Sequence, residues 1–443
     1  MAEPQRKRKT KSTQSAKAVE RPVGGGGWLL FALMVCVGAA AFPVAMTRLS
    51  SDALTPGAFF APLVGWLATA VLSLWVTRPS RFGGDRIVVA LTLLLLGLGI
   101  VEQWRLGTWV EAWRAWRAYL PLLGGVAGWL FCLQWLNSDR VSALLPRVQW
   151  LCWLGALGVL AALRLFGRSY RGGMFLPGQI NPTELVKVLL VAFTAAWLPA
   201  RTEALARTVA GVPVPPLREA LALAFLWGVP LAGAVVVRDL GLALILCLTL
   251  MLMLCAATRK VGWLAVGLGA AAAAGWGIRF LSAHSAARFA VWLDPFQDPT
   301  GKGWQIGQSL CAQFAGGLWG SGLGEGMPGT VPIVTSDFVY AALAEEWGLI
   351  GCALVLAAFW LWIWRSSRVM DTALPPPCRL LGLGLTALMG VQLVLNVGGV
   401  TKALPMTGIT LPFFSQGGFS LLTTLLLCGL VCACTNRVHG SCR

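Results

Sequence analysis

Long apolar runs, separated by short polar connections, fill most of this chain. Most of the runs are about 17–25 residues long, the length that an α-helix needs to cross a bilayer. Twelve such runs lie at residues 28–46, 56–77, 87–103, 118–137, 148–166, 183–199, 219–237, 240–257, 261–281, 337–364, 380–400 and 418–435. The pattern predicts an all-α polytopic integral membrane protein with about 12 transmembrane helices.

One segment breaks the pattern. Residues 282–336 are polar and rich in glycine, and the chain then returns to an apolar run at Asp337, with Glu345 and Glu346 further along it. Carboxylates at membrane depth are energetically expensive and are usually retained for function. A loop of this length is also more often functional than a simple connection. We therefore expect the chemistry of the protein in this region.

Charge sets the expected orientation. The chain is 57% hydrophobic and only 12% charged, with a net charge of +17. In a soluble protein such a charge would suggest nucleic acid, but no aromatic and basic binding module lies outside the apolar runs, so we expect no nucleic-acid partner. Arginine-rich connections facing anionic membrane lipids explain the charge instead. These arginine-rich connections all fall on one side of the predicted topology, except residues 104–117, whose arginines fall on the other side. By the positive-inside rule, we then expect both termini to be cytoplasmic and the loop 282–336 to lie outside.

The two ends of the chain and its cysteines add little chemistry. Residues 1–27 are basic and polar and predict a disordered cytoplasmic tail, and residues 437–443 form a short cytoplasmic tail. Most of the 12 cysteines fall within apolar runs, where cysteine behaves as a small hydrophobe. The two histidines, His284 and His439, are not next to cysteines at a metal-ligand spacing, so the sequence predicts no metal site.

A lysine inside an apolar run needs a carboxylate partner. Lys187 has Glu184 three residues earlier on the same helix face. The alternative partner is Asp239, which lies in a very short connection between two predicted helices. A Lys187–Asp239 ion pair would join two distant spans, and both pairings remain open at this point.

Asp337 also allows two interpretations. It follows Thr335 and Ser336 at the start of a predicted helix, where aspartate commonly serves as an N-cap. It can equally present a carboxylate oxygen for catalysis. Glu345 lies about 80° around the helix from Asp337 and can face the same cavity, whereas Glu346 points to the opposite side. The Gly-, Pro- and Ser-rich residues 396–420 are expected to form a second wall of that cavity.

Five segments together resemble the shape, elongation, division and sporulation (SEDS) family. They are GQINPTELVK, VVRDLGLA, RFAVWLDPFQDPTGKGWQIGQS, TSDFVYAALAEEWGLIG and LPMTGITLPFFSQGG, between residue 148 and the C-terminus. The chain departs from the family at Ile333 and Thr335, where the family has Glu and His, and at Gln416, where it has Tyr. The family usually has about ten spans. Residues 28–85 therefore look like an added N-terminal transmembrane hairpin before a family-like core at 86–436.

The resemblance implies a peptidoglycan glycosyltransferase in the bacterial cytoplasmic membrane. It would polymerise lipid II at the outer face, with a class B penicillin-binding protein as transpeptidase partner. Asp337 matches the family's essential aspartate and is the expected catalytic base, and Arg288 matches the arginine before the LDP motif. Lys187 and Asp239 also match family positions, and we hypothesise that they form a structural ion pair. The residues expected to bind substrate are Arg288, Lys302, Gln308, Ser309, Glu345, Lys402 and Ser415, although Lys402 has no family counterpart. No cofactor is predicted, and a requirement for a divalent metal is left open.

Two other classes of function compete with this one. A lipid II flippase, which is a transporter, would also place polar residues in a membrane cavity. It would need them along the full depth of the membrane, whereas a large outer loop with a carboxylate favours chemistry on one side. A scaffold that only recruits a partner would leave the buried carboxylates unexplained. The sequence does not distinguish roles in elongation, division and sporulation.

Overall fold

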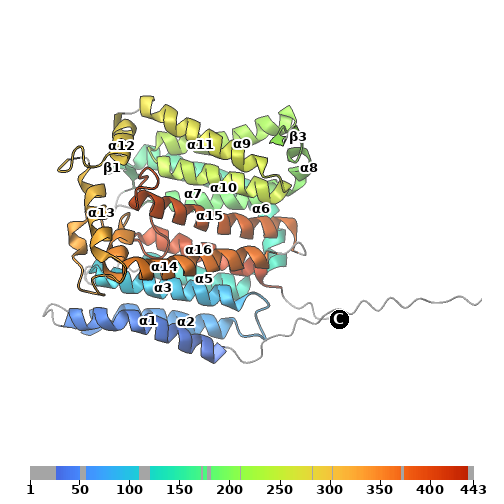
Figure 1. Ribbon diagram of the computed structural model, residues 1–443. Coiled ribbons are helices and arrows are strands. Elements are labelled where there is room, and N and C mark those ends of the chain that lie inside the picture. The colour runs from blue at the N-terminus through green and yellow to red at the C-terminus, as the bar shows by residue number, and fades with distance from the viewer. Residues whose placement is uncertain are drawn as a thin grey trace, which may run out of the picture.

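The computed structural model is a bundle of long helices that run roughly side by side (Figure 1). It describes residues 26–49, 56–108, 120–170, 173–176, 181–209, 211–281, 283–301, 303–370 and 374–437. Each of the twelve predicted spans coincides with a helix of this bundle. These helices are α1 (Gly26–Leu49), α2 (Pro56–Val76), α3 (Arg86–Arg105), α5 (Leu120–Trp135), α6 (Ser138–Phe166), α7 (Thr183–Trp197), α9 (Leu217–Val236), α10 (Leu240–Thr258), α11 (Gly262–Leu281), α14 (Val339–Val369), α15 (Pro376–Val400) and α16 (Gly418–Thr435).

The prediction of a polytopic all-α membrane protein is confirmed. Within the described residues, seven helices are long and apolar enough to cross a membrane, or eight if α7 and the bent continuation after it form one span. Shorter apolar helices occur at Phe31–Phe42, Ala61–Val76 and Leu120–Trp135. The number of about twelve membrane spans therefore remains a prediction, although a helix forms at each of the twelve predicted positions.

Short elements collect at the two ends of the bundle. The helices α12 (Ala283–Leu293) and α13 (Trp304–Gly316) lie at one end with the strand β1 (Arg168–Tyr170), which pairs antiparallel with β2 (Gly173–Phe175). The 3-10 helix η3 (Pro328–Thr330) belongs to the same outer loop. The opposite end carries η2 (Pro199–Arg201), α8 (Thr202–Leu205) and the strand pair β3 (Thr208–Val209) and β4 (Val212–Pro213).

Hydrogen bonds tie the connections together at the end that carries α8. The Asn436 side chain accepts from the Gly83 amide at 2.9 Å and donates to the Leu136 carbonyl at 3.1 Å. Asp85 caps α3 and pairs with Arg365 at 2.7 Å. Connections expected on one side of the membrane therefore meet at one end of the bundle, opposite α12 and α13. Which end faces the cytoplasm stays a prediction from charge.

The N-terminal hairpin of α1 and α2 packs mainly against α3. The Trp66 indole of α2 donates to the Leu93 carbonyl of α3 at 2.9 Å. Gly97 of α3 faces both Val37 and Trp66, so a larger residue there would push the hairpin away. The hairpin thus covers one side of the bundle, which agrees with its interpretation as an addition to a core at 86–436, and that division remains a prediction.

The helix α14 is broken at Gly348, which has φ 64° and ψ −173°. Across the break, the Ser321 amide donates to the Glu345 carbonyl at 2.9 Å and the Leu349 amide donates to the Gly317 carbonyl at 2.9 Å. At a rise of 1.5 Å per residue, Gly348 lies about 14 Å from the start of α14. Irregular backbone at membrane depth has to be satisfied by protein. The glycine-rich part of the outer loop does this by returning alongside α14.

Candidate active site

The backbone before α14 is held by three other elements. The Gln103 side chain of α3 donates to the Thr335 carbonyl at 3.0 Å. The Ser415 hydroxyl donates to the Ser336 carbonyl at 2.5 Å. The Asn396 amide of α15 donates to the Asp337 carbonyl at 3.0 Å. Three consecutive carbonyls are thus fixed by side chains from distant parts of the chain, which sets the position of Asp337.

The capping interpretation of Asp337 is wrong in this structure. The helix α14 begins at Val339, and its N-cap residue is Phe338, whose side chain makes no cap hydrogen bond. Asp337 is half-buried and precedes the cap. Its carboxylate lies beside Gly408, where an added Cβ would come within 3.5 Å of Oδ2. The Asp337 carboxylate therefore lies close to Gly408, in the segment that joins α15 to α16.

Two amides on α15 connect this segment to α7. Gln392 and Asn396 lie four residues apart and so share one helix face. Gln392 accepts from the Lys187 ammonium at 3.1 Å and donates to the Thr410 carbonyl at 3.1 Å. Asn396 donates to the Ile409 carbonyl at 2.6 Å as well as to Asp337. Polar side chains of α7 and α15 therefore converge on residues 409–410.

The predicted contact between Lys187 and Asp239 is not formed. The Lys187 ammonium pairs with the Glu184 carboxylate at 2.5 Å, while the Asp239 carboxylate accepts from the Leu242 amide at 2.8 Å and caps α10. No ion pair joins Lys187 and Asp239 among the described residues. Glu184 is favoured because it lies one turn away on the same helix. Asp239 is still close, since the charges of Lys187 and Glu184 both act on it.

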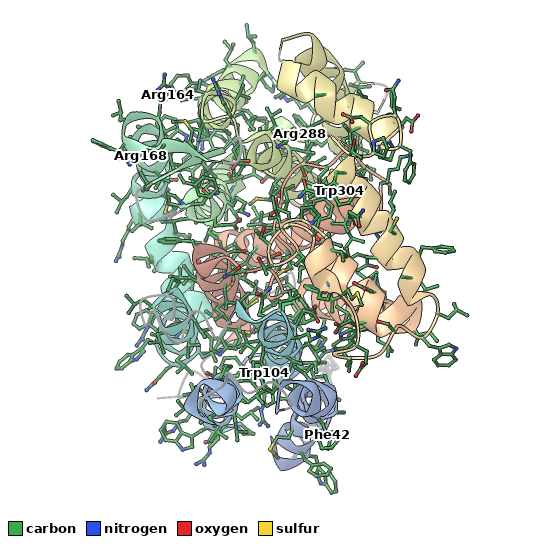
Figure 2. All side chains as sticks on the ribbon, turned by 90° about the vertical axis from the view of Figure 1, so that its left-hand side faces the viewer. Phe42, Trp104, Arg164, Arg168, Arg288 and Trp304 are labelled. Carbon is green, nitrogen blue, oxygen red and sulfur yellow. The ribbon has the colours of Figure 1, made fainter. Side chains whose placement is uncertain are left out.

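Arg288 is the predicted cation of the site. It is half-buried on α12 and lies over the interior of the bundle when the outer end faces the viewer (Figure 2). Burial lowers the pKa of its guanidinium, and the charges of Asp337 and Asp239 oppose that shift. Both carboxylates are therefore within electrostatic range of Arg288. That Arg288 and Asp337 form one substrate site stays a prediction.

Three of the other predicted binding residues have structural partners. Ser415 also accepts from the Leu411 amide at 2.7 Å, so its hydroxyl is used within the protein. Ser309 is fully buried and donates to the Val400 carbonyl at 3.2 Å, which fastens α13 to the end of α15. The backbone of Lys402 accepts from the Trp292 indole at 3.1 Å. Gln308 is half-buried on α13, and Lys302 lies outside the described residues.

Glu345 does not share the Asp337 cluster as predicted. Its carboxylate is buried and accepts from the Met327 amide at 2.9 Å. Glu346 pairs with Arg105 of α3 at 2.7 Å and accepts from the Gly324 amide at 3.0 Å. The break at Gly348 allows the glycine-rich loop to reach both side chains. These glutamates therefore hold the loop, and this replaces the expectation that Glu345 faces substrate.

Sequence reasoning missed Gln103, Gln392 and Asn396. The signal was present, because amides inside an apolar helix need buried partners, but it gave no indication of which partners.

No group of three or more His, Cys, Asp and Glu side chains within the described residues could hold a metal ion.

Comparison with known proteins gives a consistent result. A family model described as cell cycle protein, which covers FtsW, RodA and SpoVE, matches residues 115–439. Peptidoglycan glycosyltransferase RodA of Mycobacterium tuberculosis is 34% identical over 363 residues, which are 78% of this chain and 77% of the relative. Stage V sporulation protein E of Bacillus subtilis is 30% identical over 346 residues, 76% of this chain and 84% of that protein.

Solved structures show the same fold. One, from a study of how a peptidoglycan synthase complex coordinates polymerization and crosslinking, has a TM-score of 0.63 at 27% identity. The alignment covers 80% of this chain and 97% of that chain. The rod shape determining protein RodA of Thermus thermophilus has a TM-score of 0.56 at 24% identity, over 81% and 98% of the two chains, and supports the fold alone.

Proposed function

Because this chain belongs to the FtsW, RodA and SpoVE family of cell cycle proteins, we propose that it is a peptidoglycan glycosyltransferase of the bacterial membrane. Its relatives include proteins named peptidoglycan glycosyltransferase RodA and probable peptidoglycan glycosyltransferase FtsW. The substrate that fits is lipid II, in which a membrane-anchored diphosphate carries the sugar to be transferred.

The reaction requires two kinds of group at one place. A sugar hydroxyl attacks the anomeric carbon of a lipid-linked chain, the bond from that carbon to the diphosphate breaks, and the hydroxyl proton passes to a base. The lipid diphosphate leaves with its bonding electrons and needs a cation nearby. Asp337 is the proposed base, and Arg288 is the proposed cation. The clamp that holds the backbone at Asp337 carries the proposal, together with the position of Arg288 over the interior at the same end of the bundle (Figure 2).

The backbone clamp around Asp337 supports a catalytic role. A base works well only if it is held in the right geometry, and a misplacement of about 1 Å can lower the rate by about 100-fold. Three side chains from distant parts of the chain hold the carbonyls of residues 335–337. Such positioning is expected for a reacting carboxylate.

The distribution of charge favours the enzyme over the flippase. Three of the described ion pairs lie near an end of the bundle, at Lys187–Glu184, Arg201–Glu219 and Arg365–Asp85, and the fourth, Arg105–Glu346, lies about 10 Å along α14 from its start. Between the ends, hydroxyls such as those of Thr194 and Thr386 bond to carbonyls of their own helices at 2.7 and 2.8 Å. A transport path would need polar groups along the whole depth.

The outer loop also fits a partner for crosslinking. One of the similar solved chains comes from a complex that polymerises and crosslinks peptidoglycan. By analogy we propose a class B penicillin-binding protein as the partner. We further propose that the end with α12 and α13 is extracytoplasmic and that both termini are cytoplasmic, as the arginine distribution indicates.

Replacing Asp337 tests the proposal. Asp337→Asn keeps the size of the side chain but removes the base, so lipid II polymerisation by the purified protein should fall by about 10²–10⁴-fold. Glu325→Gln, at an exposed carboxylate in the outer loop, is the matched control and should keep its activity. Full activity of Asp337→Asn would contradict the assignment of the base. Lipid II flipping in vesicles without polymerisation by the unmodified protein would favour the transporter instead.

A further inference from the structure

A groove opens between the adjoining ends of α5 and α6, at the end of the bundle that carries Asn436. It has a volume of about 420 Å³ and is lined in part by Phe131, Trp135, Arg140, Ala143, Leu144 and Arg147. The Ser138 amide at the start of α6 donates to the Asn436 carbonyl at 3.0 Å, which places the groove beside the C-terminal end of α16. It is therefore remote from Asp337 and Arg288.

The groove exists because α5 and α6 diverge after the turn that joins them. The helix α5 packs mainly against α16, whereas α6 packs mainly against α7. Large apolar side chains stay uncovered along the opening, with Phe131 56%, Trp135 55% and Leu144 48% exposed. In a membrane these walls face hydrocarbon, and a tryptophan near a helix end is typical of the headgroup level. The walls suit an acyl chain and the glycerol region of a lipid.

Two arginines give the groove its charge. Arg140 and Arg147 are exposed and lie seven residues apart on α6, which places them on one face about 10 Å apart along the helix. One N–H of Arg140 donates to the Trp135 carbonyl at 2.6 Å, and the guanidinium has four more N–H groups. Asp139 lies next to Arg140, but the lining of the groove contains no carboxylate. The lining is therefore cationic at its polar positions and apolar elsewhere.

We propose that this groove binds one anionic phospholipid, with its headgroup phosphate between Arg140 and Arg147 and an acyl chain along Phe131 and Leu144. The arginine distribution puts this end of the bundle at the cytoplasmic leaflet, whose anionic lipids attract basic residues. A zwitterionic lipid carries no net charge to match the arginines. A free phosphate would leave the apolar walls uncovered. The site does not depend on the proposed glycosyltransferase activity.

Native mass spectrometry of the full-length protein in detergent tests the site, with phosphatidylglycerol and phosphatidylcholine added in turn. The unmodified protein should retain one phosphatidylglycerol in preference to phosphatidylcholine. At about 1 kcal/mol per arginine, the variant R140Q/R147Q should bind phosphatidylglycerol roughly 30-fold more weakly, and R147Q roughly fivefold more weakly. R147Q is the safer variant, since Arg147 makes no hydrogen bond or ion pair among the described residues.

Two further variants separate the groove from general surface charge. R368Q removes an exposed arginine that lies over the Trp364 ring on α14 and does not line the groove, and it should bind phosphatidylglycerol normally. A143W fills the groove without changing its charge and should abolish the adduct. Equal binding of both lipids, unchanged binding by R140Q/R147Q and A143W, or an equal loss in R368Q would overturn the proposal. Displacement of the lipid by millimolar inorganic phosphate alone would also overturn it.

Discussion

Replacing Asn396 by leucine should separate positioning of the site from stability of the fold. The side chain is 1% exposed and donates to two carbonyls, those of Asp337 and Ile409. Leucine is close to asparagine in size but cannot donate. Each buried carbonyl left unpaired costs about 1–3 kcal/mol, so the loss amounts to about 2–6 kcal/mol. Removal of the Asn396 Oδ1, which is buried without a hydrogen bond, returns about 1–3 kcal/mol of this.

The net destabilisation is therefore about 1–3 kcal/mol, which the folded protein should tolerate. The rate should suffer more, because the carbonyl of Asp337 loses the donor that holds it to α15. A shift of about 1 Å in a catalytic group lowers the rate by about 100-fold. We expect Asn396→Leu to lower kcat by about this factor while KM for lipid II changes little, since Arg288 is untouched.

The assay combines two measurements on the same purified sample. Initial rates of lipid II polymerisation at several concentrations give kcat and KM, and thermal unfolding in detergent gives the apparent Tm. Thr386→Val is the matched control on α15, because it removes a buried hydroxyl that bonds only within its own helix at 2.8 Å. It should lower the Tm modestly and leave kcat unchanged. Unchanged kcat in Asn396→Leu, or an equal loss in Thr386→Val, would refute the positioning argument.

The remaining predictions concern charge and orientation. Lys187→Met leaves the Glu184 carboxylate unpaired at a mostly buried site and should reduce accumulation of the protein in an expression assay. The double variant Lys187→Met with Glu184→Gln should restore accumulation, and no rescue would argue against this pair. Arg288→Gln should raise KM for lipid II by roughly 10–100-fold through loss of a charge-assisted contact, with Arg288→Lys in between; an unchanged KM would remove Arg288 from the binding site. A cysteine at Thr300 should react with a membrane-impermeant reagent on intact cells, and labelling only after lysis would reverse the orientation.

Local sequence patterns predicted the helices well because each depends on a property of a single segment. An apolar run long enough to span a bilayer forms a helix whatever its neighbours are, since the backbone must satisfy its own hydrogen bonds there. The runs at 87–103 and 418–435 needed no knowledge of the rest of the fold. The same holds for the polar loop before Asp337. Its length and glycine content marked it as unusual without any tertiary contact.

Local reasoning failed where two segments compete for one group. Asp337 had the sequence context of an N-cap, yet α14 begins at Val339, and the Gln103 and Asn396 side chains hold the backbone at residues 335 and 337. Glu345 had the helical phase to face the site. The break at Gly348 and the return of the glycine-rich loop gave its carboxylate another partner, the Met327 amide.

The sequence by itself determined the membrane class, the helix positions and the alternation of the connections between the two ends of the bundle. It also identified Asp337 and Arg288 as candidates. These features follow from hydropathy, spacing and charge along the linear sequence. Only the tertiary structure decided the partner of Lys187, the role of Glu345 and the clamp that holds the backbone at Asp337. Gln103 and Thr335 are 232 positions apart, and Asn396 and Asp337 are 59 apart. Such contacts depend on how the helices pack, and a buried donor takes whichever carbonyl the packing brings within reach.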